Sequence, residues 1–142
     1  MFATIGYEGA TLEDVIARLG EAGIETLVDV RAVAASRRAG FSKTVLSESL
    51  REVGIAYLHL RGLGTPKPGR EAARKGRVAE MRAIYEAHLE TPEARDAWAA
   101  LLAAVTESRV ALLCYEADAA GCHRRVLADR LSTQAGLACV DL

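Results

Sequence analysis

Short apolar runs alternate with helical patterns along the whole chain, and this alternation limits the possible folds more than any other feature. Five runs have the composition of strands, at residues 3–6, 26–30, 55–60, 109–115 and 137–142. Between them, apolar residues recur at intervals of three and four, which is the period of a helix. Strands that alternate with helices in this way predict a parallel sheet with helices on both faces.

The expected architecture is a Rossmann-like α/β sandwich of three layers. The chain has 142 residues, a length that favours one domain over residues 1–142. Right-handed crossovers between five mainly parallel strands favour the strand order 3-2-1-4-5. In that order, ligands bind at the carboxyl ends of the strands, in the crevice between strands one and four.

Composition excludes several other classes of protein. Hydrophobic residues make up 51% of the chain and charged residues 26%, which argues against disorder and repeat arrays. No apolar run reaches 18 residues and the first residues do not form a signal peptide, so we expect a cytoplasmic protein without a membrane partner. Three cysteines are an odd number, which fits a reducing compartment.

The net charge of −1 hides a basic segment between residues 31 and 82. This segment holds twelve Lys and Arg against four Asp and Glu, a balance typical of a surface that binds phosphates or other anions. Within it, residues 61–76 contain four glycines and two prolines and are expected to form a basic, mobile loop over the site. Charges scattered over an ordinary solvated surface are the alternative.

Polar side chains follow three of the strands at their carboxyl ends. They are Tyr7 and Glu8 after the first strand, Asp29 and Arg31 after the second, and Cys114, Glu116, Cys122, His123 and Arg124 after the fourth. The carboxyl ends of parallel strands lie at one edge of a sheet, so these groups are expected to meet there. Strand ends are polar in many α/β proteins, which is the alternative explanation.

Four of these residues are candidates for catalysis. Cys122 lies at the start of a helix, where the dipole and nearby Arg124 favour a reactive thiolate. His123 is a candidate for proton transfer because its ordinary pKa is close to neutrality, and a histidine bonded to a backbone group at the end of a helix is the alternative. Glu116 is a second candidate for proton transfer. Cys114 is a small core residue or the partner of Cys122 in a reversible disulfide. A buried, inert Cys122 is the alternative.

No metal and no cofactor are expected from the sequence. The spacing of the four possible ligands Cys114, Glu116, Cys122 and His123 does not match a CxxC-type site. Neighbouring helical residues point about 100° apart, which argues against one ion shared by Cys122 and His123. A complete GxGxxG motif is absent from the chain, so a dinucleotide is not supported.

The sequence resembles a family known as domain of unknown function 488. The motifs that carry the resemblance are Thr4-Ile5-Gly6-Tyr7, Asp29-Val30-Arg31, Ser36 with Phe41, Gly54-Ile55 with Tyr57, Leu63-Gly64, and Cys114-x-Glu116 followed by Cys122-His123-Arg124. The resemblance covers nearly the whole chain. It implies no established activity, as the name of the family says.

Two functions from different classes are compatible with these patterns. In the first, the chain is an enzyme for an anionic, phosphate-bearing or nucleotide-like substrate. The candidates for binding that substrate are Arg31, Arg124, Asp29, Tyr7 and Ser36. In the second, the chain is a non-catalytic module whose basic segment binds nucleic acid or another anion. We favour the enzyme because the polar groups converge on one edge of the sheet.

Overall fold

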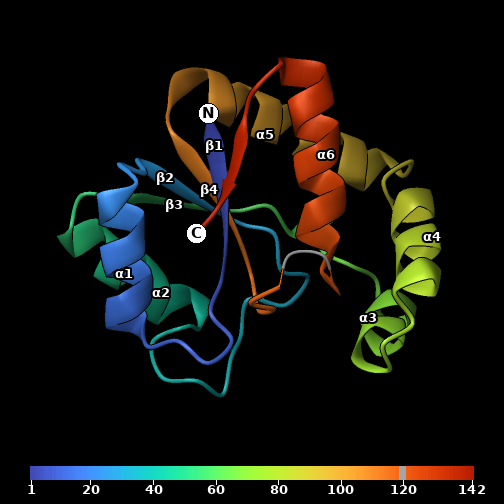
Figure 1. Cartoon of the computed structure of the whole chain (residues 1–142), viewed down its shortest axis with the longest axis horizontal. Helices are drawn as coiled ribbons and strands as arrows, with labels where there is room; N and C mark the ends of the chain where they lie inside the picture. Colours follow the sequence, from blue (N-terminus) through green and yellow to red (C-terminus); the bar gives the residue numbers. More distant parts are fainter. Residues whose placement is uncertain (119–120) are drawn as a thin grey trace.

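The computed structural model describes residues 1–118 and 121–142 and has one sheet between two layers of helices (Figure 1). The strands are β1 (Phe2–Gly6), β2 (Thr26–Asp29), β3 (Ala56–His59), β4 (Val110–Cys114) and β5 (Cys139–Asp141). All four pairings between them are parallel. The predicted class, an α/β sandwich with five parallel strands, is confirmed.

The strand order is β3-β2-β4-β1-β5, so the predicted order 3-2-1-4-5 was wrong. The expected contact between β1 and β4 is present, but β4 also pairs with β2 and therefore separates β2 from β1. Leu112 of β4 lies level with Thr4 on one side and Val28 on the other. Every residue of β4 is buried, as expected for an apolar strand at the centre of a parallel sheet.

The helices are α1 (Leu12–Glu21), α2 (Lys43–Glu52), α3 (Lys67–Arg74), α4 (Val78–His88), α5 (Pro92–Glu107) and α6 (His123–Ala135). The side chains of Thr11 and Thr91 cap α1 and α5, because each accepts a hydrogen bond from the first turn of its helix, whereas Ser42 at the start of α2 makes no such bond. Among the described residues, no helix is long and apolar enough to cross a lipid bilayer.

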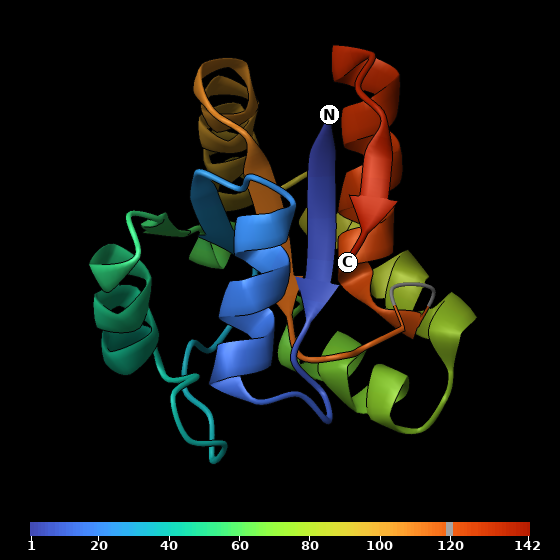
Figure 2. The same cartoon turned by 60° about the vertical axis from the view of Figure 1, so that its left-hand side comes forward.

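The two faces of the sheet build two separate cores. Alternate residues of β4 point to opposite faces, so Leu112 and Cys114 pack with α3 to α6 while Ala111 and Leu113 pack with α1 and α2. Figure 2 shows β1 pointing toward the end of the molecule where the loops after β1 and β4 gather beside α3. This end holds the carboxyl ends of the strands.

Residues 61–76 are folded, which corrects the expectation of a loop throughout. Arg61–Leu63 form a 3-10 helix and Lys67–Arg74 form α3. Pro68 falls in the first turn of α3, where a missing backbone N–H costs little. Ala72 is buried against the core, and Gly76 ends the segment with a positive φ of 74°. The helix brings its basic side chains to the carboxyl end of the sheet.

Candidate functional site

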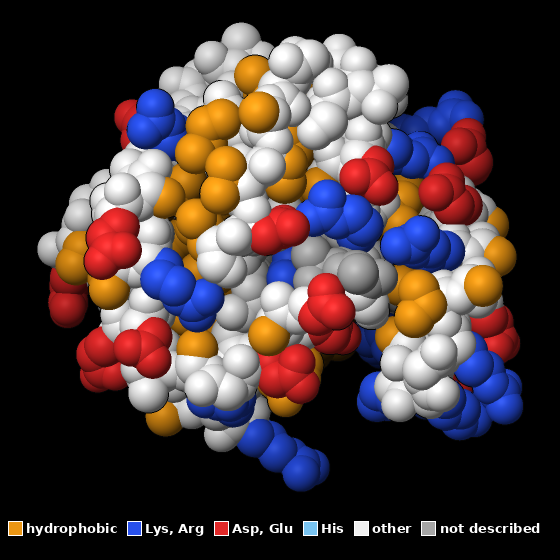
Figure 3. Space-filling model, viewed as in Figure 1, with side chains coloured by type: hydrophobic (Ala, Val, Ile, Leu, Met, Phe, Trp, Pro, Cys, Tyr) orange, Lys and Arg blue, Asp and Glu red, His pale blue; other side chains and the backbone are white. Residues whose placement is uncertain are grey.

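A cavity of about 560 Å³ lies at the carboxyl ends of β1, β2 and β4, and this volume suits a small molecule or a nucleotide. Its walls come from the loops after these strands, from α3 and from the start of α6. Figure 3 shows a notch at the lower edge of the molecule with Lys and Arg side chains gathered on its α3 side. A cavity therefore lies at the edge of the sheet where the polar side chains were expected to meet.

Six of the predicted site residues line this cavity: Tyr7, Arg31, Cys114, Glu116, Cys122 and His123. The other three do not: Asp29, Ser36 and Arg124. Ser36 instead holds a turn, in which its Oγ accepts a hydrogen bond from the backbone N–H of Arg38. Asp29 and Arg124 are buried behind the wall. The first group can contact a ligand directly, and the second can act only through its neighbours.

The two cysteines and the histidine meet at the wall of the cavity. Cys114 is the last residue of β4, Cys122 is the N-cap of α6 and His123 begins that helix. Cys114 and Cys122 are joined by a disulfide, although their Cα atoms are 7.7 Å apart, which is wider than the usual 4.4–6.8 Å. In this state Cys122 is bonded and buried, which corresponds to the disulfide alternative for this pair and not to a free thiolate.

The side chains of Cys122 and His123 lie against each other. The prediction that they diverge by about 100° and so cannot share one ion was therefore wrong. The Sγ atom of Cys122 lies 3.5 Å from Nδ1 of His123. Cys122 has an extended backbone, with φ −125° and ψ 150°, because it is the N-cap and not a helical residue. The 100° rotation between helical neighbours does not apply across that position.

His123 is held in one orientation and is neutral near pH 7. Its Nε2 atom lies 2.7 Å from the carbonyl oxygen of Val30, which only accepts hydrogen bonds, so Nε2 carries the proton. The lone pair on Nδ1 therefore faces the sulfur of Cys122. Burial lowers the pKa of His123 to about 4. A neutral ring cannot stabilise a thiolate as an imidazolium would.

Arg124 supplies a buried positive charge directly behind Cys114. Its NH1 group is 3.2 Å from the Sγ atom of Cys114 and also donates to the carbonyl of Glu116, while NH2 donates to the carbonyl of Ala117. These carbonyls are neutral, and the ion pairs found among residues 1–118 and 121–142 do not include Arg124. The guanidinium therefore favours a negative charge on Cys114 when the disulfide is open.

Two carboxylates, those of Glu8 and Glu116, line the cavity beside the segment after β4. Oε2 of Glu116 lies 3.2 Å from Sγ of Cys114, and Oε1 of Glu8 accepts a hydrogen bond from the backbone N–H of Ala117. Gly6, at the end of β1, leaves room for the backbone of Glu116, since a Cβ there would overlap the carbonyl oxygen. Glu116 is half-buried at the cavity wall, where it can accept a proton.

Asp29 and Arg31 form an internal ion pair. Asp29 accepts two hydrogen bonds from the Arg31 guanidinium, at 2.9 and 2.7 Å, and one from the hydroxyl of Tyr57 at 2.5 Å. Burial opposes the charge on Arg31, but the bonds and charge of Asp29 outweigh burial and raise the pKa of Arg31. The NH1 group of Arg31 also donates to Tyr7 and to the carbonyl of Phe41. Most N–H groups of the Arg31 guanidinium are therefore already bonded within the protein and cannot bind a substrate.

Two arginines of α3 line the cavity and were not among the individual residues predicted for the site. Arg70 and Arg74 are four residues apart, so they lie on one face of the helix. Their spacing of four residues could have placed both arginines on one surface, but only if the segment had been predicted to be helical. The basic composition of residues 61–76 did indicate that this segment contributes to the site.

The buried state of His123 predicts a stability that depends on pH. Between pH 6.5 and pH 4 the unfolded chain binds a proton that the native protein does not, so the free energy of unfolding falls as the pH is lowered through this window. The expected loss is roughly 3 kcal/mol. Urea unfolding in the presence of a chelator, at steps across the window, measures it. His123→Gln should remove this part of the slope, and an unchanged slope would contradict the assignment.

One comparison with known proteins identifies a family for this chain. A family model described as domain of unknown function DUF488 matches residues 11–131, which include β2, β4 and the start of α6. No curated protein and no solved structure shows significant similarity to the chain. Because the match covers most of the chain, the protein belongs to the DUF488 family.

Proposed function

We propose that the chain is an enzyme that acts on a small anionic substrate, phosphate-bearing or nucleotide-like, within this cavity. The observation that carries the proposal is that one cavity is lined both by reactive groups and by cationic groups. The reactive groups are His123, Glu116 and, once their disulfide is reduced, Cys114 and Cys122, and the cationic groups are Arg70 and Arg74. Perturbed titratable groups in a concave site are typical of catalysis.

The two arginines of α3 can bind an anion. NH1 of Arg70 donates to the carbonyl of Thr65 at 2.8 Å, which orients the guanidinium. Neither Arg70 nor Arg74 takes part in an ion pair within the described part of the chain. A guanidinium without a carboxylate partner at a cavity wall suits a phosphate or carboxylate group.

An aromatic wall supports a nucleotide-like substrate. Tyr7 packs on Phe41 with ring centroids 4.3 Å apart and meets Tyr115 edge to face at 5.3 Å. Tyr7 and Tyr115 both line the cavity, and Tyr115 is 43% exposed. Exposed aromatic rings bind bases by stacking, with little dependence on sequence.

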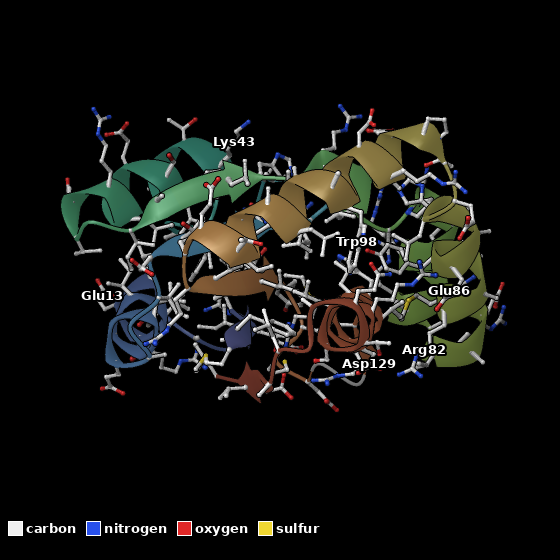
Figure 4. All side chains as sticks on the ribbon, turned by 90° about the horizontal axis from the view of Figure 1, so that it is seen from above. Glu13, Lys43, Arg82, Glu86, Trp98 and Asp129 are labelled. Carbon is white, nitrogen blue, oxygen red and sulfur yellow. A yellow bond between two sulfur atoms is a disulfide. The ribbon has the colours of Figure 1, made fainter. Side chains whose placement is uncertain are left out.

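The alternative, a module that binds nucleic acid through the whole basic segment, is less well supported. The charges of this segment lie on separate parts of the molecule, with Lys43 on α2 and Arg82 on α4 far apart in Figure 4. A phosphate backbone requires cations along one continuous surface. The cationic residues that line the cavity form a more compact group, which favours a small ligand.

Titration of the protein with inorganic phosphate and with AMP, followed by NMR, tests the proposal. Arg70→Ala combined with Arg74→Ala should weaken binding of both ligands by about tenfold or more, because two charge-assisted hydrogen bonds are lost. Lys43→Ala combined with Arg51→Ala removes the same charge from α2, outside the cavity, and should change affinity less than twofold. Equal losses in both double variants would support a diffuse basic surface instead.

A further inference from the structure

The side chains of Cys114, Cys122 and His123 place three potential metal ligands at one point. The two Sγ atoms and a ring nitrogen of His123 all lie within 4.8 Å of one another. All three residues are buried, yet each contributes to the wall of the cavity. Two sulfurs and one imidazole nitrogen are ligands that Zn²⁺ prefers, and catalytic zinc sites combine three protein ligands with one open position.

The surroundings orient the imidazole as in a metal site. Nε2 of His123 is held by the carbonyl of Val30 at 2.7 Å, which leaves Nδ1 directed at the sulfur of Cys122. The ring also packs edge to face against Tyr85, with centroids 5.1 Å apart. Histidines that bind metals usually donate the other ring N–H to a carbonyl or a carboxylate, which fixes the tautomer and the ring orientation.

The charges of this cluster balance when a divalent cation is added. Two thiolates and Glu116 carry three negative charges, while Zn²⁺ and Arg124 together carry three positive charges. Arg124 is 1% exposed and its NH1 lies 3.2 Å from Sγ of Cys114. Buried charges require partners of opposite sign, so the cation would complete a neutral cluster.

We propose that reduced Cys114 and Cys122, together with His123, bind one Zn²⁺ ion whose remaining coordination position opens into the cavity. The disulfide is the oxidised, metal-free state of the same pair. A phosphine opens it, since the phosphine and one water molecule give a phosphine oxide and two thiols. Binding of Zn²⁺ then releases the two thiol protons to solvent, and two Zn–S bonds form.

The open position is what connects the metal to the cavity. Zn–S bonds of about 2.3 Å place two sulfurs roughly 3.8 Å apart, and the Cα separation of 7.7 Å leaves room for this arrangement. The fourth ligand would be water or an oxygen of the anionic substrate, with Glu116 beside it. This part of the proposal rests on the proposed function, because it assumes that the substrate occupies the cavity.

Cobalt substitution tests the site. The whole chain is reduced with a phosphine, freed of it under nitrogen and titrated with CoCl₂. We expect one Co²⁺ per chain, with thiolate-to-cobalt charge-transfer absorption and the visible bands of tetrahedral cobalt. An equimolar amount of Zn²⁺ should displace the Co²⁺ and abolish both absorptions. Cys114→Ser, Cys122→Ser and His123→Gln should each weaken binding by about 100-fold or more, while Cys139→Ser should bind as the wild type does.

A second measurement covers variants that fail to fold. In the wild-type protein, Zn²⁺ should protect Cys114 and Cys122 from alkylation, while Cys139, which is free and partly buried, should react at an unchanged rate. Absence of cobalt absorption in the reduced wild type, or its loss in Cys139→Ser, would overturn the metal site. Phosphate binding that persists without cobalt binding overturns the metal site alone. Cobalt binding without any phosphate or AMP binding overturns the proposed substrate class alone.

Discussion

Replacing Asp29 by asparagine is expected to lower the free energy of unfolding by about 3–5 kcal/mol. Asp29 is fully buried, and Arg31 beside it is only 6% exposed. The substitution keeps the size of the side chain but leaves the guanidinium buried without its counter-ion, and it also weakens the bond from Tyr57. Urea unfolding followed by circular dichroism measures the change.

Glu48→Gln is the matched control for Asp29→Asn. It also removes one carboxylate from an ion pair, but Glu48 and its partner Arg51 are 64% and 79% exposed. Exposed pairs on a helix contribute about 0.5 kcal/mol or less, so the free energy of unfolding should hardly change. A similar, small effect in both variants would mean that burial does not strengthen the dependence of Arg31 on Asp29.

Gly6→Ala is expected to destabilise the protein by more than about 3 kcal/mol or to prevent folding, because overlap with backbone atoms cannot be relieved by a rotamer change. A Cβ at position 6 would overlap the carbonyl of Glu116 and lie 2.8 Å from NH1 of Arg124. The backbone after β4 would have to move, together with the residues that hold Cys114. Thermal and urea unfolding of the purified variant measure this loss.

Gly20→Ala is the control for Gly6→Ala. Gly20 lies near the end of α1, and nothing lies within 4 Å of a Cβ at that position. Alanine is the better helix former, so this variant should be more stable than the wild type by up to about 1 kcal/mol. If Gly6→Ala were equally well tolerated, the close approach of β1 to the segment after β4 would be incorrect.

The edge of the sheet at which the cavity lies was predicted from the alternation of strands and helices. A run such as Val110–Cys114 is apolar on both faces, and Leu12, Val15 and Leu19 fall on one face of a helix. These patterns are local, since the period of a strand or helix is set by its own backbone. They fix the α/β class, and the class then fixes the edge of the sheet at which Cys114 and Cys122 meet.

The order of the strands could not be obtained in this way. Every residue of β1 and of β4 is buried, so burial alone does not say which of the two strands neighbours β2. That choice depends on how α1 and α5 pack over the sheet, which is a property of the whole chain. The helix α3 was missed for a related reason, because Pro68 and Gly69 at its start indicate a loop until the burial of Ala72 is known.

The order of residues along the chain indicates which side-chain types reach the cavity, whereas the contacts that set the chemistry of each one come from the packing of distant segments. Arg31 was a candidate for binding substrate, but the fold buries it against Asp29, whose carboxylate neutralises the charge of the guanidinium. Cys122 and His123 were expected to diverge, but the N-cap geometry turns them together. Hydrogen-bond partners and burial depend on segments distant in the chain, so no local pattern could specify them.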